Sequence, residues 1–171
     1  IKALDNYLIA DRYISQVNNP GLTYKIKYEI AKIKYYLGFY HEAISLLREC
    51  VTYFEEENDR GYLNSLHVLG MCYTRIGKYE LASETNQLGI DQGCLFEDTS
   101  MKFYFNHSEA VNQCFRKDYV GAIKKLKAAL PDVVAVEDCA NTAIAYFYIG
   151  KSYWLLRQQN DAIVYFKKVD Q

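Results

Sequence analysis

Three histidines are the side chains of this sequence best suited to bind a metal ion or to move a proton. His67 and His107 are 40 residues apart, and His41 stands in a short turn-like segment where we expect it to be exposed. If helices repeat with that period, equivalent positions on neighbouring helices lie about 10 Å apart, so two imidazoles could share a ligand but not one metal ion. No third ligand stands close in the sequence. We therefore predict no metal site and interpret His67 and His107 as partly buried hydrogen-bonding groups.

Cysteines are the second group of reactive side chains, and they number five: Cys50, Cys72, Cys94, Cys114 and Cys139. The count is odd and no C-x-x-C pair occurs, which argues against a disulfide framework. We interpret these residues as free thiols that fill small core positions. Such usage favours a reducing compartment without excluding an exported domain.

Catalytic motifs are missing from the sequence. It contains no glycine-rich phosphate loop, no H-E-x-x-H and no G-x-S-x-G, and no nucleophile–base pair can be assembled from the pattern. We predict that the chain is not an enzyme and that it takes no cofactor.

Composition limits the remaining classes. Half of the 171 residues are hydrophobic, with 17 tyrosines and two prolines, which suits a helical domain with an aromatic core. The formal net charge is −1 and no basic block is present, so we predict no contact with nucleic acid. No apolar run approaches the roughly 18 residues that a membrane-spanning helix needs. We predict no membrane-spanning segment in this sequence.

An internal repeat organises the chain. Residues 146–169, YFYIGKSYWLLRQQNDAIVYFKKV, have apolar positions at helical spacing on both sides of a short polar turn, which predicts a helical hairpin. Related turns read GFYHEA, GKYELA, KDYVGA and RQQNDA. They end at Ala43, Ala82, Ala122 and Ala162, which are 39, 40 and 40 residues apart. We predict that these four alanines lie where the two helices of each hairpin cross.

The period predicts an all-α chain of about nine helices without strands. We expect residues 1–18 to form the second helix of a preceding repeat, followed by hairpins over 22–57, 60–93, 99–130 and 138–171. Pro131 cannot continue a helix easily, so residues 131–137 are predicted to be the longest connection. We expect one domain over 1–171 that is a fragment of a longer chain.

The order I-G-x-x-Y, a small residue and a late aromatic residue resembles the tetratricopeptide repeat, here with a period of about 40 in place of the usual 34. The resemblance implies a right-handed α–α superhelix, a tetratricopeptide-repeat-like solenoid. The segments YFNHSEAVNQCFRKDYVGAIKKLKAALP and YFYIGKSYWLLRQQNDAIVYFKKVD resemble the long-repeat sensor regions of Bacteroidetes regulators with AraC- or LuxR-type helix-turn-helix domains.

That second resemblance implies the sensor or interaction part of a bacterial transcription regulator. The protein would lie in the bacterial cytoplasm, or be attached to the inner membrane through a segment outside this sequence. An alternative resemblance, to the Rap and PlcR peptide receptors, implies a receptor for a signalling peptide. Both interpretations predict a protein or peptide segment as the partner, and both leave a homodimer open.

The tetratricopeptide resemblance also implies where such a partner would bind, because the first helix of each hairpin presents inward-facing positions. These positions combine aromatic rings with the cations Lys32, Arg75 and Lys151, and this combination suits an acidic or carboxylate-ended segment. Simple packing against neighbouring helices is the alternative for any one of them. The candidate ligand-binding residues are Tyr28, Lys32, Tyr35, Asn64, His67, Arg75, Tyr104, His107, Phe147, Lys151 and Trp154.

One helix departs from the repeat pattern. Glu109 stands where the motif carries leucine, and Gln113 stands where it carries tyrosine. A carboxylate between helices needs partners. Either the helix rotates to expose Glu109 to solvent, which we prefer, or Glu109 anchors a polar network or a ligand.

Overall fold

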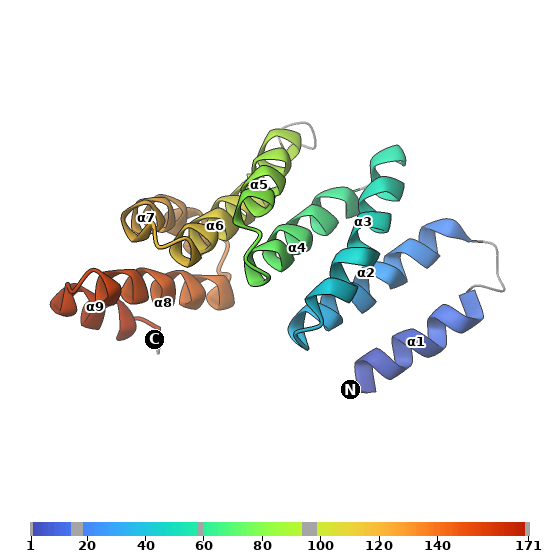
Figure 1. Cartoon of the computed structure of the whole chain (residues 1–171), viewed down its shortest axis with the longest axis horizontal. Coiled ribbons are helices and arrows are strands. Elements are labelled where there is room, and N and C mark those ends of the chain that lie inside the picture. Colours follow the sequence, from blue (N-terminus) through green and yellow to red (C-terminus); the bar gives the residue numbers. More distant parts are fainter. Residues whose placement is uncertain (1, 15–18, 58–59, 94–98, 170–171) are drawn as a thin grey trace. The chain divides into compact units, whose positions relative to one another are not determined.

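The computed structural model of the chain describes residues 2–14, 19–57, 60–93 and 99–169, and within these ranges every regular element is an α-helix (Figure 1). Nine helices occur in the described part and no strand does. The chain is therefore all-α, as predicted. The helices are α1 Lys2–Ile14, α2 Pro20–Tyr36, α3 Tyr40–Glu56, α4 Gly61–Arg75, α5 Tyr79–Gly93, α6 Thr99–Phe115, α7 Tyr119–Ala135, α8 Cys139–Leu155 and α9 Gln159–Phe166.

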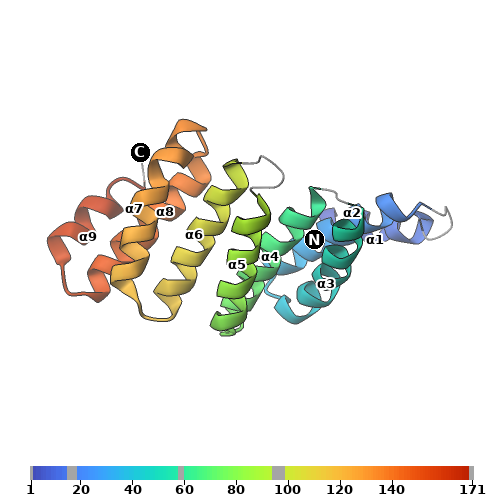
Figure 2. The ribbon, with the colours of Figure 1, turned by 90° about the horizontal axis from the view of Figure 1, so that it is seen from above.

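Helices pair as hairpins, with α2 on α3, α6 on α7 and α8 on α9 (Figure 2). Each predicted turn contains a residue in the left-handed region: Gly38 at φ 85°, Gly77 at φ 74°, Lys117 at φ 68° and Arg157 at φ 64°. Glycine adopts this conformation without penalty, whereas the two long side chains do so at a cost of roughly 1 kcal/mol. The turn geometry is thus kept in all four hairpins although only two of them use glycine.

Small residues lie where the two helices of a hairpin cross. Ala43, Ala82, Ala122 and Ala162 are all fully buried, which agrees with their predicted positions. On α8, a Cβ added to Gly150 would lie 2.8 Å from the ring of Phe166 and 3.3 Å from the carbonyl oxygen of Ala162. The second helix of this hairpin passes too close to α8 for a larger side chain.

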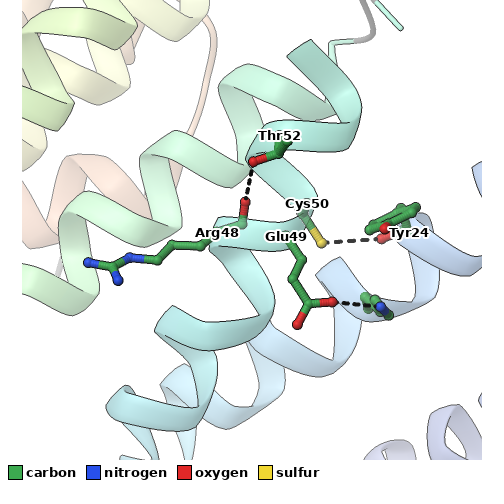
Figure 3. A network of polar contacts seen from close by, with 6 residues as sticks. Tyr24, Arg48, Glu49, Cys50 and Thr52 are labelled. Atoms are coloured by element: carbon green, nitrogen blue, oxygen red, sulfur yellow. Dashed lines mark hydrogen bonds and ion pairs between the residues drawn. The ribbon is translucent and has the colours of Figure 1, made fainter. Parts of the chain in front are cut away.

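The α2–α3 pair shows how the hairpins are held by mixed contacts (Figure 3). The rings of Tyr24 and Tyr53 stack with centroids 4.1 Å apart, and Lys27 forms an ion pair with Glu49 at 2.7 Å. The thiol of Cys50 donates to the carbonyl oxygen of Tyr24 at 3.5 Å. Burial raises the pKa of Cys50 to about 12, so this thiol stays protonated.

Most cysteines have the role expected of them. Cys50, Cys72 and Cys114 are free and buried, as predicted for small core residues. Cys139 is free but exposed, so for this residue the prediction of a core position is wrong. Cys94 lies outside the described residues.

The packing divides the chain into two compact units, residues 1–85 and 86–171, and each has its own core. Leu47, Val68 and Cys72 lie in a buried cluster of the first unit. Leu126 and Ile149 lie in one of the second. The prediction of one domain over 1–171 stays a prediction.

The prediction that Pro131 ends its helix is wrong. α7 continues through Pro131 to Ala135, and the predicted connection over 131–137 shrinks to residues 136–138. Pro131 removes one helical hydrogen bond on an exposed face. The turn beyond it is retained because Val133 is fully buried in a cluster with Phe103 and Ala129.

Candidate functional site

The first candidate surface lies in unit 1 and consists of Tyr28, Lys32 and Tyr35 from α2 with Asn64, His67 and Arg75 from α4; we call it the α2–α4 face. α2 and α4 pack against each other, so these residues come from adjacent helices. All are half-buried except Arg75, which is exposed.

Two cations of the α2–α4 face are already engaged. Arg75 Nε donates to Tyr35 Oη at 3.4 Å, which joins the two helices. Lys32 Nζ lies 2.8 Å from a carboxylate oxygen of Glu29 and 5.3 Å from the centre of the Tyr28 ring. Burial, reinforced by Glu29, raises the pKa of Tyr28 to about 12, so its phenol keeps its proton. The face therefore presents protonated donors at neutral pH, with the charge of Lys32 balanced by Glu29.

The second candidate surface lies in unit 2 on one side of α8, and we call it the α8 face. It consists of Ile144, Phe147, Lys151, Trp154 and Leu155. The four apolar members are 42%, 44%, 54% and 42% exposed in that order. Lys151 Nζ lies 5.5 Å from the centre of the Phe115 ring and 5.6 Å from that of Tyr148, so the cation is held over aromatic rings.

The opposite side of α8 is also apolar. Ala145 and Ile149 are buried there in the core of unit 2. α8 therefore has apolar side chains on both sides. One side is buried in the core, and the other stays 42–54% exposed although the Phe147 ring centre lies 6.2 Å from that of Phe166 on α9.

Tyr104 and His107, the candidates on α6, lie beside the start of α8. Tyr104 Oη donates to Asp138 Oδ2 at 2.8 Å, and the Asp138 carboxylate also caps α8 by accepting from Asn141 N at 3.0 Å. Burial acts to raise the pKa of Asp138, but hydrogen bonds from Asn141 and Tyr104 and the nearby His107 hold it below its ordinary value. This carboxylate is therefore ionised at neutral pH.

His107 is buried, with 6% of its surface exposed. Burial lowers its pKa to about 4, against the opposing effect of Asp138, so the imidazole is neutral at pH 7. Its ring lies 5.9 Å from that of Phe103. His107 therefore packs in the interior and does not present a surface to a ligand. His41 is exposed, as expected.

Glu109 belongs to a polar network within unit 2, so the preferred interpretation that it faces solvent is wrong. Its Oε2 accepts from Asn86 Nδ2 at 3.0 Å and from Asn112 Nδ2 at 3.4 Å. Both asparagines are fully buried. Asn86 stands where the other hairpins carry Leu47, Leu126 or Phe166, and this break in the repeat is the signal that pairs it with Glu109.

Metal-binding groupings are not found in the described ranges, where no three histidine, cysteine, aspartate or glutamate side chains come together as ligands. Within the same ranges, no helix combines the length and the hydropathy needed to cross a bilayer.

Comparison with known proteins finds a similar repeat and similar folds. A tetratricopeptide-repeat family model matches residues 22–91. The crystal structure of a Rap protein complexed with competence and sporulation factor has a TM-score of 0.89 to this chain at 13% identity, over 98% of this chain and 47% of that one. The apo form of RapI has a TM-score of 0.79 at 16% identity, over 98% and 61%.

These matches support the tetratricopeptide-repeat family and confirm the predicted solenoid of helical hairpins. At such identities the structural similarity shows the fold alone. A similar sequence is that of response regulator aspartate phosphatase J of Bacillus subtilis (strain 168), 29% identical over 97 residues, which are 57% of this chain and 26% of that protein. The chain spans about a quarter of that relative and about half of the Rap protein. The predicted relation to Bacteroidetes regulators stays a prediction.

Proposed function

We propose that this chain binds a peptide and that the α8 face holds the apolar part of it. The observation that carries the proposal is the exposed strip of Ile144, Phe147, Trp154 and Leu155 around Lys151. A helix with apolar side chains all round is normally covered on all sides. Covering the strip would remove apolar surface from water at roughly 25 cal/mol per Å².

The chemistry of the peptide follows from the side chains that would meet it. Aromatic residues dominate the energetics of interfaces because they offer large rigid surfaces. Lys151 adds a positive charge in the middle of the strip. The fitting ligand is a segment with apolar anchors and a carboxylate placed among them.

The α2–α4 face would favour the same ligand class by its charge. Lys32 and Arg75 supply N–H donors on this face, and Arg75 is exposed, so a ligand carboxylate can reach its guanidinium. We propose that this face binds an acidic residue of a partner segment.

A peptide receptor is favoured over other binding modules by the relatives. The Rap protein with the highest structural similarity reported above is complexed with competence and sporulation factor. The Bacillus relative is named as a response regulator phosphatase. We therefore put the peptide-receptor interpretation first and extend it to this chain as a hypothesis.

A selection from a peptide library, with competence and sporulation factor as a second probe, tests the proposal. Trp154 is the only tryptophan and is 54% exposed, so its fluorescence should report binding at the α8 face. Lys151→Ala should lower the affinity for the selected peptides about 10-fold, since a hydrogen bond to a charged group contributes about 1.5–3 kcal/mol. Lys167→Ala, an exposed lysine beyond α9, is the matched control and should have no effect. Equal binding by both variants would overturn the proposal.

The sensor part of a transcription regulator is the second interpretation. It rests on the resemblance of the two long segments to Bacteroidetes sensor regions. Sequencing the complete gene tests it: a helix-turn-helix domain in the same chain supports it, and a complete gene without one rejects it.

We also propose that binding, not catalysis, is the activity of this chain. The phosphatase named above makes a direct assay worthwhile. Incubating the chain with a phosphorylated response regulator should leave the phosphoryl group in place. Loss of phosphate that depends on the chain would reject this part of the proposal.

A further inference from the structure

A cavity of about 620 Å³ lies in unit 2 between the amino-terminal half of α6 and the carboxyl-terminal half of α7. Its volume falls within the range of about 300–1,000 Å³ that small-molecule sites occupy. The apolar part of its wall includes Phe103 and Tyr104 from α6 and Ala128 and Ala129 from α7. It belongs neither to the α8 face nor to the α2–α4 face.

The apolar wall is firmly held. Phe103 is buried in a cluster with Ala129 and Val133, and its ring centre lies 5.2 Å from that of Tyr104. The hydrogen bond from Tyr104 to Asp138 fixes the second ring. Because both rings are anchored from behind, the wall offers a preformed surface to a ligand.

Charged side chains also line this cavity. Lys102 and Lys125 contribute two positive charges and Asp132 one negative charge. Among the described residues, none of these three side chains takes part in an ion pair or hydrogen bond. The cavity therefore combines a small apolar wall with two lysines that lack a carboxylate partner in the described part of the chain.

We infer that this cavity binds an apolar group that carries a carboxylate, such as the carboxyl-terminal residue of a peptide. The side chain of the ligand lies against Phe103 and Tyr104, where the alanines of α7 leave room. The carboxylate lies between Lys102 and Lys125. Asp132 opposes the ligand's charge but leaves the site with a net positive charge.

Titration of the whole chain with N-acetyl-phenylalanine tests this inference, with N-acetyl-phenylalaninamide as the control that differs only in charge. Binding is followed by backbone amide chemical shifts. We expect shifts in α6 and α7 and a carboxylate that binds about 5-fold more tightly than the amide, because a charge-assisted hydrogen bond is stronger than a neutral one. Equal binding of the two probes, or binding of neither, overturns the inference.

Four substitutions make the test specific to the cavity. Lys125→Gln should lower the affinity for N-acetyl-phenylalanine about 5-fold, whereas Lys124→Gln, at the neighbouring exposed lysine, should leave it unchanged. Asp132→Asn should strengthen binding about 2-fold by removing a like charge. Ala128→Phe should fill the space and abolish binding; because Ala128 is exposed, the helix should tolerate the ring, which circular dichroism checks.

Binding that survives Ala128→Phe in a folded chain, or equal effects of Lys124→Gln and Lys125→Gln, counts against the inference. Lys167→Ala removes an exposed lysine beyond α9 and should leave N-acetyl-phenylalanine binding unchanged. The peptide-receptor proposal depends on Lys151 and this inference does not, so failure of one is distinguishable from failure of the other.

Discussion

Arg75 and Tyr35 stand 40 residues apart in the sequence, one repeat period, and meet through a hydrogen bond from Arg75 Nε to Tyr35 Oη at 3.4 Å. The contact brings equivalent regions of α2 and α4 together. The repeat pattern predicts both residues as ligand-binding candidates, and in unit 1 they lie on one surface.

Replacement of Arg75 separates binding from stability. The bond to Tyr35 is long and Arg75 is exposed, so Arg75→Ala should cost less than about 1 kcal/mol of the free energy of unfolding. An acidic peptide that uses this face should bind about 10-fold more weakly. Thermal melting and a peptide titration measure the two effects. Lys78→Ala, which removes an exposed lysine in the following turn, is the control. If it lowers the affinity for the peptide as much as Arg75→Ala does, Arg75 acts only through long-range electrostatic attraction and makes no direct contact.

Overpacking tests the helix crossings. Ala122 is fully buried, so Ala122→Leu should destabilise the chain by roughly 1–3 kcal/mol. Ala135→Leu adds the same atoms at the exposed end of α7 and should cost little. Urea unfolding of both variants compares the costs. Matching midpoints would mean that Ala122 is not a packing position.

The turn residues allow a stabilising substitution. Lys117 holds a φ of 68° without being glycine, so Lys117→Gly should raise the free energy of unfolding by roughly 0.5–1 kcal/mol. Gly77 holds the same conformation and no atom lies closer than 3.9 Å to an added Cβ, so Gly77→Ala should cost a similar amount. Thermal melting should show shifts of opposite sign; shifts in the same direction would reject the conformational explanation.

Stability should depend on His107 at mildly acidic pH. Burial lowers the pKa of His107 from 6.5 to about 4, so between these values the unfolded chain binds the proton that the folded chain excludes. The free energy of unfolding therefore has its full value above about pH 6.5. It decreases by roughly 3 kcal/mol as the pH falls towards 4.

Denaturant unfolding at pH 7 and pH 4.5 measures this dependence. His107→Gln should flatten the difference, whereas the exposed His41→Gln should leave it as in the parent. An unchanged pH dependence in His107→Gln would assign the effect to other groups.

The polar network around Glu109 predicts non-additive substitutions. Glu109→Leu alone leaves the buried Asn86 without its acceptor and should cost about 1–3 kcal/mol. Adding Asn86→Leu restores the apolar residue of the other hairpins and should recover most of that loss. A double-mutant cycle measures the coupling. Additive costs would show that the two side chains act independently.

The sequence by itself determined the hairpins, their turns and their crossings, because these depend on local propensity and on spacing. The alanines that recur every 39 or 40 residues are all buried, and α2 to α9 follow the repeat. Local rules failed where packing across helices outweighed them. Pro131 lies inside α7 because buried Val133 stabilises the turn beyond it.

Only the tertiary structure decided which candidate residues are accessible. His107 and Phe147 occupy equivalent positions in successive repeats, so the sequence predicts the same exposure for both. In the structure His107 is 6% exposed and Phe147 is 44% exposed, because exposure depends on the neighbouring side chains. The same reason explains Glu109: whether its carboxylate faces water or Asn86 depends on a residue 23 positions away. The cavity between α6 and α7 likewise arises from side chains distant in sequence, which no period in the sequence predicts.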